Sequence, residues 1–295
     1  MNTTKIERLE SPIGTIEVAI EDAGKKQNLL LIHGFNDTKE TFVFLKGTLL
    51  NRFNLISFDF PGHGGSEWKK DGMYSLQDNL VALHSVVNTY LPEQFFILAH
   101  SMGAGIASRF TGLFPQSVKG LILFEGFSGL QPEKREAERI KNWLIGLSKK
   151  KPKREENSSR RPMSLEEATS KLSIVYQGLS KEKISLLALG LIRSVPPNMY
   201  VWKNDPRLKL GNPIPFPPKL SRYLWKEISC KTLMIYGMKT HLMPENMEEI
   251  KSHFNFLEYA EIENSSHNMH HDNPEKVLEL ITNFLDKNFH SEFLS

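Results

Sequence analysis

One serine stands among small residues directly after a buried apolar run, a position that favours nucleophilic chemistry. The run at 95–99 reads FFILA and continues into HSMGAG, in which Ser101 is the serine. The stretch approaches G-x-S-x-G, the strained strand-to-helix turn that exposes a nucleophile and demands small neighbours, with Ala99 in place of the first glycine. A serine that only caps the following helix is the alternative. We predict that Ser101 is a nucleophile.

A nucleophilic serine needs a general base, and His267 comes a few residues after the last predicted strand at 257–262. In a parallel sheet the carboxyl ends of the strands meet at one edge, so this position suits a base for Ser101. His270 and His271 follow three and four residues later, a spacing that can hold a metal on a helix. No further ligand cluster is apparent and both fit surface positions at a helix start, so we predict no metal site. His100 is expected to be packed rather than catalytic.

The third member of such a triad is a buried carboxylate that orients the histidine. Its usual place, after the strand that precedes the histidine, holds Thr240 and no acid before Glu245. The apolar strand before that one ends directly at Glu125. We therefore predict Glu125 as the triad acid; the alternative is a glutamate that only binds loop amides.

Backbone N–H groups are predicted to hold the negative oxygen that forms during acyl transfer. The buried strand at 28–32 ends at His33-Gly34-Phe35, where glycine lets the backbone approach a bound group. The N–H of Phe35 is one expected donor, and the N–H of Met102, at the start of the helix after Ser101, is the other. Both side chains are also expected to wall the acyl pocket.

Strands and helices alternate on both sides of a long interruption. Strands are predicted at 15–20, 28–32, 54–58, 95–99, 120–124, 232–236 and 257–262, and helices at 38–50, 75–90, 103–114, 244–253 and 274–289. Continuous apolar strands separated by helices indicate a parallel sheet covered on both faces. Ser75 and Asp78 form an S-x-x-D start signal for the second helix.

The interruption contains helical segments at 133–148, 164–177 and 181–193 and no strand of comparable quality. We read it as an inserted helical cap. The predicted organisation is a hydrolase core at 1–130, the cap at 131–222 and the rest of the core at 223–295. Five aromatic residues in or near the insertion suggest an apolar lid, with packing inside the insertion as the alternative: Trp143, Trp202, Phe216, Tyr223 and Trp225.

Composition excludes several classes of protein. The chain has 295 residues, 40% of them hydrophobic, and a net charge of +3, which gives no global electrostatic case for nucleic acid or a membrane surface. The basic segment at 149–161 lacks interleaved aromatics and is expected to be a solvated loop, and no apolar run is long enough to span a membrane. The single cysteine, Cys230, excludes an intramolecular disulfide, is expected to be a packed thiol and fits a cytoplasmic location. The oligomeric state stays open.

Several of these motifs together resemble the α/β-hydrolase superfamily over nearly the whole chain: His33-Gly34, the turn from Asp59 to Ser66, the Ser101 elbow, and His267 followed by Asp272 and Pro274. Phe124-Glu125-Gly126 and the stretch 200–208 are similar to the serine hydrolase-like branch. The resemblance implies an α/β-hydrolase fold, a mostly parallel doubly wound sheet with an inserted helical cap, and no cofactor. It also implies structural rather than catalytic roles for Asp59, His63 and Ser66. Ala99 and Thr240 depart from the family pattern.

The expected activity is that of a carboxylesterase. Ser101, His267 and Glu125 would hydrolyse a carboxylic ester or related small acyl substrate through an acyl-enzyme, with the amides of Phe35 and Met102 as the oxyanion hole. Hydrolysis of a carbon–carbon bond by the same triad is one alternative. A noncatalytic binding protein of the same fold is the other, and Thr240 is its supporting sign.

Overall fold

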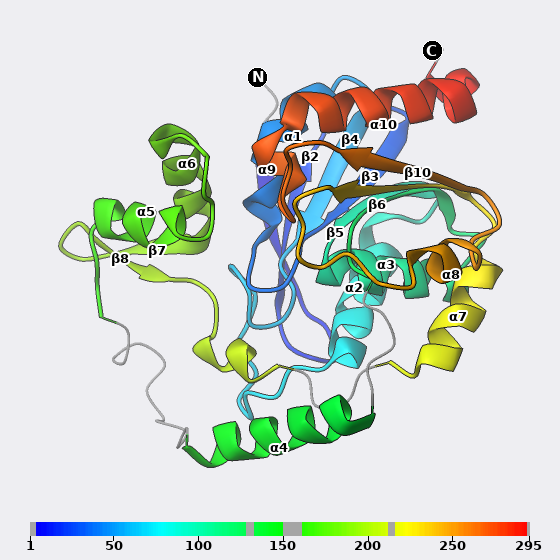
Figure 1. The fold of residues 1–295 in the computed structure, drawn as a ribbon. Coiled ribbons are helices and arrows are strands. Elements are labelled where there is room, and N and C mark those ends of the chain that lie inside the picture. The colour runs from blue at the N-terminus through cyan, green and yellow to red at the C-terminus, as the bar shows by residue number, and fades with distance from the viewer. Residues whose placement is uncertain (1–3, 128–132, 150–160, 212–215, 294–295) are drawn as a thin grey trace.

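A parallel sheet forms the centre of the computed structural model, which describes residues 4–127, 133–149, 161–211 and 216–293 (Figure 1). Its eight strands run in the order β1-β2-β4-β3-β5-β6-β9-β10. They are β1 (Thr4–Leu9), β2 (Ile16–Glu21), β3 (Gln27–Ile32), β4 (Phe53–Phe58), β5 (Phe95–His100), β6 (Val118–Phe124), β9 (Lys231–Gly237) and β10 (Leu257–Ile262). All neighbouring pairs from β4 to β10 are parallel, and β1 and β2 add an antiparallel edge. The predicted fold class is confirmed.

The central strands are apolar on both faces because helices cover both. Alternate residues of β3 divide between two cores: Leu30 and Ile32 pack with α2 (Leu76–Tyr90) and α3 (Met102–Leu113), whereas Leu29 and Leu31 pack with α1 (Val43–Leu49) and α10 (Pro274–Phe289). Figure 1 shows α7 (Pro218–Glu227) on the first side and α9 (Met269–Asp272) on the second. This arrangement brings the carboxyl ends of β3, β5, β6, β9 and β10 to one edge.

The helices predicted for the core are present, and two of them are shorter than predicted. Ser75 and Asp78 form the predicted capping box at the start of α2, with Ser75 Oγ accepting from the Asp78 N–H at 3.0 Å. The predicted helix at 38–50 is divided into a 3₁₀ turn, η1 (Lys39–Phe42), and α1. The helix predicted at 244–253 is limited to α8 (Met247–Lys251).

Three strands were missed. The edge strand β1 carries only two apolar residues, Ile6 and Leu9, because most of its side chains are exposed. The other two, β7 (Ile192–Val195) and β8 (Met199–Trp202), form an antiparallel pair inside the segment predicted to be helical. Each has four residues, too few for a two-residue alternation to stand out, and Asn198 makes the turn between them with φ of 59°. The predicted helix at 181–193 therefore ends at Leu191.

Between β6 and β9 the described chain also forms α4 (Glu133–Lys149), α5 (Leu165–Ser173), α6 (Lys181–Leu191) and a 3₁₀ turn, η2 (Pro206–Leu210). Figure 1 shows α5, α6, β7 and β8 beside the sheet and α4 apart from them. The α5–α6 pair packs over η1 and α1, where Val43 and Phe44 contact its apolar cluster. Most of the basic segment at 149–161, and the first predicted domain boundary at 130–131, lie outside the described residues. Across the second predicted boundary, α7 packs on α3 of the core, and Trp225 Nε1 donates to Ser108 Oγ at 3.1 Å.

No helix in the described ranges combines the length and apolar character needed to cross a bilayer. Cys230 is buried, and its burial raises the thiol pKa to about 12, as expected of a packed thiol. The cytoplasmic location stays a prediction.

Candidate active site

Ser101 occupies a strained turn between β5 and α3. Its φ of 55° and ψ of −121° lie in a region that L-residues rarely adopt, the conformation expected at a nucleophile elbow. Gly103 is required in the following turn, because a Cβ there would lie 2.4 Å from the His33 carbonyl oxygen. Ala99, where the pattern has glycine, is fully buried in β5. The alanine therefore fits the turn that the serine needs.

The structure brings Ser101, His267 and Glu125 together in one hydrogen-bonded chain. His267 Nδ1 lies 2.6 Å from Glu125 Oε2, and His267 Nε2 lies 2.9 Å from Ser101 Oγ. A carboxylate accepts, so Nδ1 carries the hydrogen and Nε2 has the lone pair that receives the Ser101 hydroxyl hydrogen. The Glu125 side chain is fully buried, whereas that of His267 is 19% exposed. This is the geometry of a serine nucleophile, its base and the group that orients the base.

Glu125 is held by residues at the end of β9. Gly237 N–H donates to Oε1 at 3.2 Å, and Thr240 Oγ1 donates to Oε2 at 2.8 Å. Glu125 itself has a φ of 54°, a second strained residue at this edge of the sheet. Thr240, noted in the sequence only as a missing acid, thus binds the carboxylate that occupies the acid's place. The competing acid Glu245 is exposed.

The two backbone donors predicted for the oxyanion hole border Ser101. Met102 is the first residue of α3, so its N–H has no acceptor within the helix. The loop that carries Phe35 passes close by, since a Cβ at Gly34 would lie 3.1 Å from Ser101 Cβ. Within the described chain neither the Phe35 nor the Met102 N–H has a hydrogen-bond acceptor. Both are therefore free to bind a substrate oxygen.

Buried polar groups fix the shape of the loop that carries Phe35. His63 Nε2 accepts from the Asn36 N–H at 3.1 Å, and burial lowers the His63 pKa to about 3, which keeps this nitrogen an acceptor. Asp59 pairs with Lys39 Nζ at 2.7 Å and accepts from the Gly65 N–H. These contacts fit the structural roles implied for Asp59 and His63.

The expected lid aromatics are scattered. Trp225 is buried in the core against Phe127 and Phe254, so its assignment to a lid was wrong. Phe216 packs under Arg109, whose guanidinium lies 4.8 Å from the ring centroid. Tyr223 is 59% exposed, and Trp143 and Trp202 are half-buried.

Two of the three remaining histidines near Ser101 differ from expectation. His270 and His271 are fully buried rather than at the surface, because α9 is covered by η1 and by Tyr176, whose ring lies 5.3 Å from that of His271. His100 is buried, as expected. Its ring centroid lies 4.5 Å from that of His270. Sequence spacing gave no signal for this burial, which depends on η1 and Tyr176 packing over α9.

Comparison with known proteins places this geometry in context. The model of the alpha/beta hydrolase family matches residues 29–280. A serine hydrolase-like protein of Danio rerio is 26% identical over 288 residues, which cover 94% of this chain and 87% of the relative. A probable serine hydrolase of Drosophila melanogaster is 23% identical over 93% of this chain and 85% of its own length. Among solved structures, a thioesterase domain from the curacin biosynthetic pathway superposes with a TM-score of 0.80 at 20% identity, covering 95% of this chain and all of that domain.

Proposed function

The chain belongs to the alpha/beta hydrolase family, and from that premise we propose that it is a serine hydrolase that cleaves a carboxylic ester or related small acyl substrate. One observation carries the proposal: the unbroken hydrogen-bonded chain from Ser101 Oγ through His267 to the buried Glu125 carboxylate. Serine, histidine and acid then act as nucleophile, base and orienting group.

Acylation begins with the Ser101 hydroxyl. As Oγ attacks the carbonyl carbon of the substrate, His267 Nε2 takes the hydroxyl proton and becomes an imidazolium that Glu125 stabilises. The carbonyl oxygen becomes an oxyanion and accepts hydrogen bonds from the N–H groups of Phe35 and Met102. Removing one such donor from an oxyanion hole typically lowers kcat by about 10²–10³-fold.

Collapse of this intermediate breaks the bond to the leaving group, which departs with the proton from His267. A water molecule then attacks the Ser101 ester while His267 Nε2 takes its proton. A second tetrahedral intermediate collapses to the free acid and returns the proton to Ser101 Oγ. Atoms and charges balance over the cycle, and Glu125 stays ionised throughout.

We also propose that the segment 131–222 acts as a cap over this edge of the sheet. Asn204 supports this role because it joins two loops of the core. Its Oδ1 accepts from the Gly64 N–H at 2.8 Å, and its Nδ2 donates to the Asp37 carbonyl at 3.4 Å. The cap thereby contacts the loop that carries Phe35, a position from which it can select the size of the acyl group.

A fluorophosphonate probe tests the proposed nucleophile, because it labels only an activated serine. We expect stoichiometric labelling of the intact chain at Ser101, no labelling of Ser101→Ala, and normal labelling of the control Ser85→Ala on α2. A panel of p-nitrophenyl esters of increasing chain length then defines the acyl group. The proposal is refuted if the probe does not modify the intact wild-type protein. It is also refuted if the probe modifies Ser101→Ala as fully as the wild type.

A further inference from the structure

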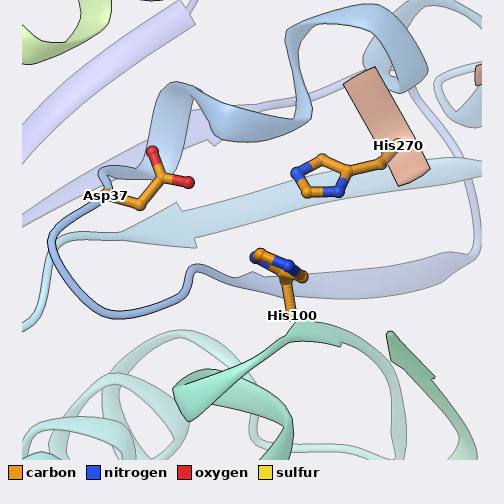
Figure 2. Close-up of side chains that lie close together, drawn as sticks. All are labelled: Asp37, His100 and His270. Atoms are coloured by element: carbon orange, nitrogen blue, oxygen red, sulfur yellow. The ribbon is translucent and has the colours of Figure 1, made fainter. Parts of the chain in front are cut away.

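A group of two buried imidazoles and one half-buried carboxylate adjoins Ser101 and takes no part in the proposed reaction. One ring nitrogen each of His100 and His270 and one carboxylate oxygen of Asp37 lie within 4.8 Å of one another. Figure 2 shows the side chains approaching each other from three elements: the loop after β3, the end of β5, and α9. Their convergence is a product of the fold, since 233 positions separate Asp37 from His270.

The His100 ring offers a lone pair. Its Nε2 lies 3.0 Å from the backbone oxygen of His267, and a carbonyl only accepts, so Nε2 carries the hydrogen. Nδ1 is then the unprotonated nitrogen. It is buried and lacks a hydrogen-bond partner in the described structure.

The His270 ring is placed in a similar way. Its Nε2 lies 3.0 Å from Thr41 Oγ1, which also lies 3.0 Å from His271 Nε2. In the tautomer in which His270 Nε2 donates to the Thr41 hydroxyl oxygen, Nδ1 holds the lone pair. This Nδ1 is likewise buried without a partner among the described residues. Buried polar atoms in folded proteins nearly always have a hydrogen-bond partner, so two unpartnered ring nitrogens beside one carboxylate point to a ligand.

Two imidazoles and a carboxylate form a ligand set that proteins use for Zn²⁺, and imidazole favours transition metals over Ca²⁺ and Mg²⁺. Zinc-binding histidines are usually oriented by a hydrogen bond at the ring nitrogen that does not bind the metal. The His267 carbonyl has this place at His100, and the Thr41 hydroxyl has it at His270. Tetrahedral zinc ligands lie about 3.4 Å apart, so the three atoms need to close by up to about 1.4 Å. Asp37 is half-buried in the loop before η1, and its Oδ1 accepts from the Thr38 N–H at 2.8 Å, so metal binding requires its side chain to rotate away from that N–H.

We propose that Asp37, His100 and His270 form a Zn²⁺ site whose occupancy inhibits the hydrolase. The inhibitory effect, though not the binding, rests on the proposed function. His267 must become an imidazolium during acylation, and the ring centroids of His100 and His267 are 4.7 Å apart. A divalent cation bound to the neighbouring His100 ring raises the free energy of the His267 imidazolium and slows the step that forms it.

Metal binding is measured first, without reference to activity. Equilibrium dialysis of the full chain against Zn²⁺ should give one ion per chain, and Co²⁺ should give the visible absorption of a tetrahedral site. Asp37→Asn should weaken Zn²⁺ binding at least tenfold. Asp71→Asn is the matched control, because Asp71 also accepts a nearby backbone N–H but is exposed, and it should bind zinc as the wild type does.

A second variant distinguishes loss of a zinc ligand from loss of folding. His270→Gln, compared with His84→Gln on α2, should lose binding while its circular dichroism stays that of the wild type. The exposed His241, whose ring lies 6.5 Å from that of His267, offers a competing location for zinc. Absence of stoichiometric binding, unchanged binding in Asp37→Asn and His270→Gln, or loss of binding in His241→Ala each overturns the proposed site.

Inhibition is measured as ester turnover against free Zn²⁺, with each variant normalised to its own zinc-free rate. We expect loss of turnover that a chelator reverses, and at least tenfold more zinc needed for Asp37→Asn. Full turnover of the zinc-loaded wild type overturns the inhibitory role. If the chain hydrolyses no ester and takes up no fluorophosphonate, the proposed function has failed, while the dialysis result still decides whether zinc binds.

Discussion

His267 and the three histidines beside it share a residue type but occupy opposite environments. Both ring nitrogens of His267 have partners that suit proton transfer, Ser101 on one side and Glu125 on the other, and the ring touches solvent. His100, His270 and His271 are buried, and each leaves Nδ1 without a partner within the described structure. The comparison teaches that a carboxylate partner and contact with solvent distinguish the proposed general base from its buried neighbours.

Removing the Glu125 carboxylate leaves His267 without a charged partner, like its neighbours, and should have the largest effect on turnover. Glu125→Gln leaves the side-chain shape but withdraws the charge that orients and stabilises the imidazolium, so kcat for an activated ester should fall about 10⁴-fold. Steady-state kinetics measure it, with Glu245→Gln, an exposed acid, as the control that keeps wild-type turnover. Equal losses in the two variants would contradict the assignment of Glu125.

A rescue sharpens the same test. Thr240 Oγ1 lies 2.8 Å from Glu125 Oε2, so an aspartate at 240 places a carboxylate near the same imidazole nitrogen. Thr240→Asp in a Glu125→Ala background should therefore recover part of the lost turnover. Thr240→Asn in that background is the neutral control, and an equal rate in both would rule out the charge as the cause.

A smaller effect is expected from the residue that holds the acid. Thr240→Val removes one hydrogen bond to a charged group, worth about 1.5–3 kcal/mol, so kcat should fall by about 10–100-fold with KM unchanged. Thr240→Ser keeps the hydroxyl and should keep the rate. A fall in thermal stability without a fall in kcat would show that Thr240 supports the fold rather than the acid.

The neighbouring histidines should act on stability rather than on rate. Burial lowers the pKa of His63 to about 3 and of His271 to about 4, from 6.5, and lowers the pKa of His33, His100 and His270 as well. As the pH falls, these histidines bind protons in the unfolded chain before they do so in the folded chain. The stability of the folded chain that depends on their neutral state is therefore complete above pH 6.5 and declines as pH falls toward 4. For His63 and His271, whose folded pKa lies well below 6.5, the slope is up to about 1.4 kcal/mol per pH unit for each residue within that window.

The carboxyl group of Asp37 opposes this trend. Burial raises its pKa to about 6, so its cost to the fold is present at neutral pH and is relieved as pH falls through 6. Urea midpoints between pH 7 and 4 measure the balance, and His271→Asn should flatten the curve relative to the control His84→Asn. A midpoint independent of pH over this range would contradict the neutral state of the buried histidines.

Predictability followed the length and burial of each element. The central strands and the helices α2, α3 and α10 were predicted because each is long and has a marked apolar pattern or start signal. The strands β1, β7 and β8 were missed because one is an exposed edge and two have four residues each. Ser101, His267 and Glu125 were predicted as a triad from their places after strands, and their mutual contact follows from the parallel order of β5, β6, β9 and β10.

By itself the sequence determined the fold class, the strained turn at Ser101 and the set of polar residues at the strand ends, since these depend on local pattern and strand order. Only the tertiary structure decided that Thr240 binds the Glu125 carboxylate, that Trp225 belongs to the core, and that His270 is buried beside His100 and Asp37. Those contacts join segments far apart in the chain. Their distances depend on how helices and loops pack over the sheet, and no spacing along the chain encodes that packing.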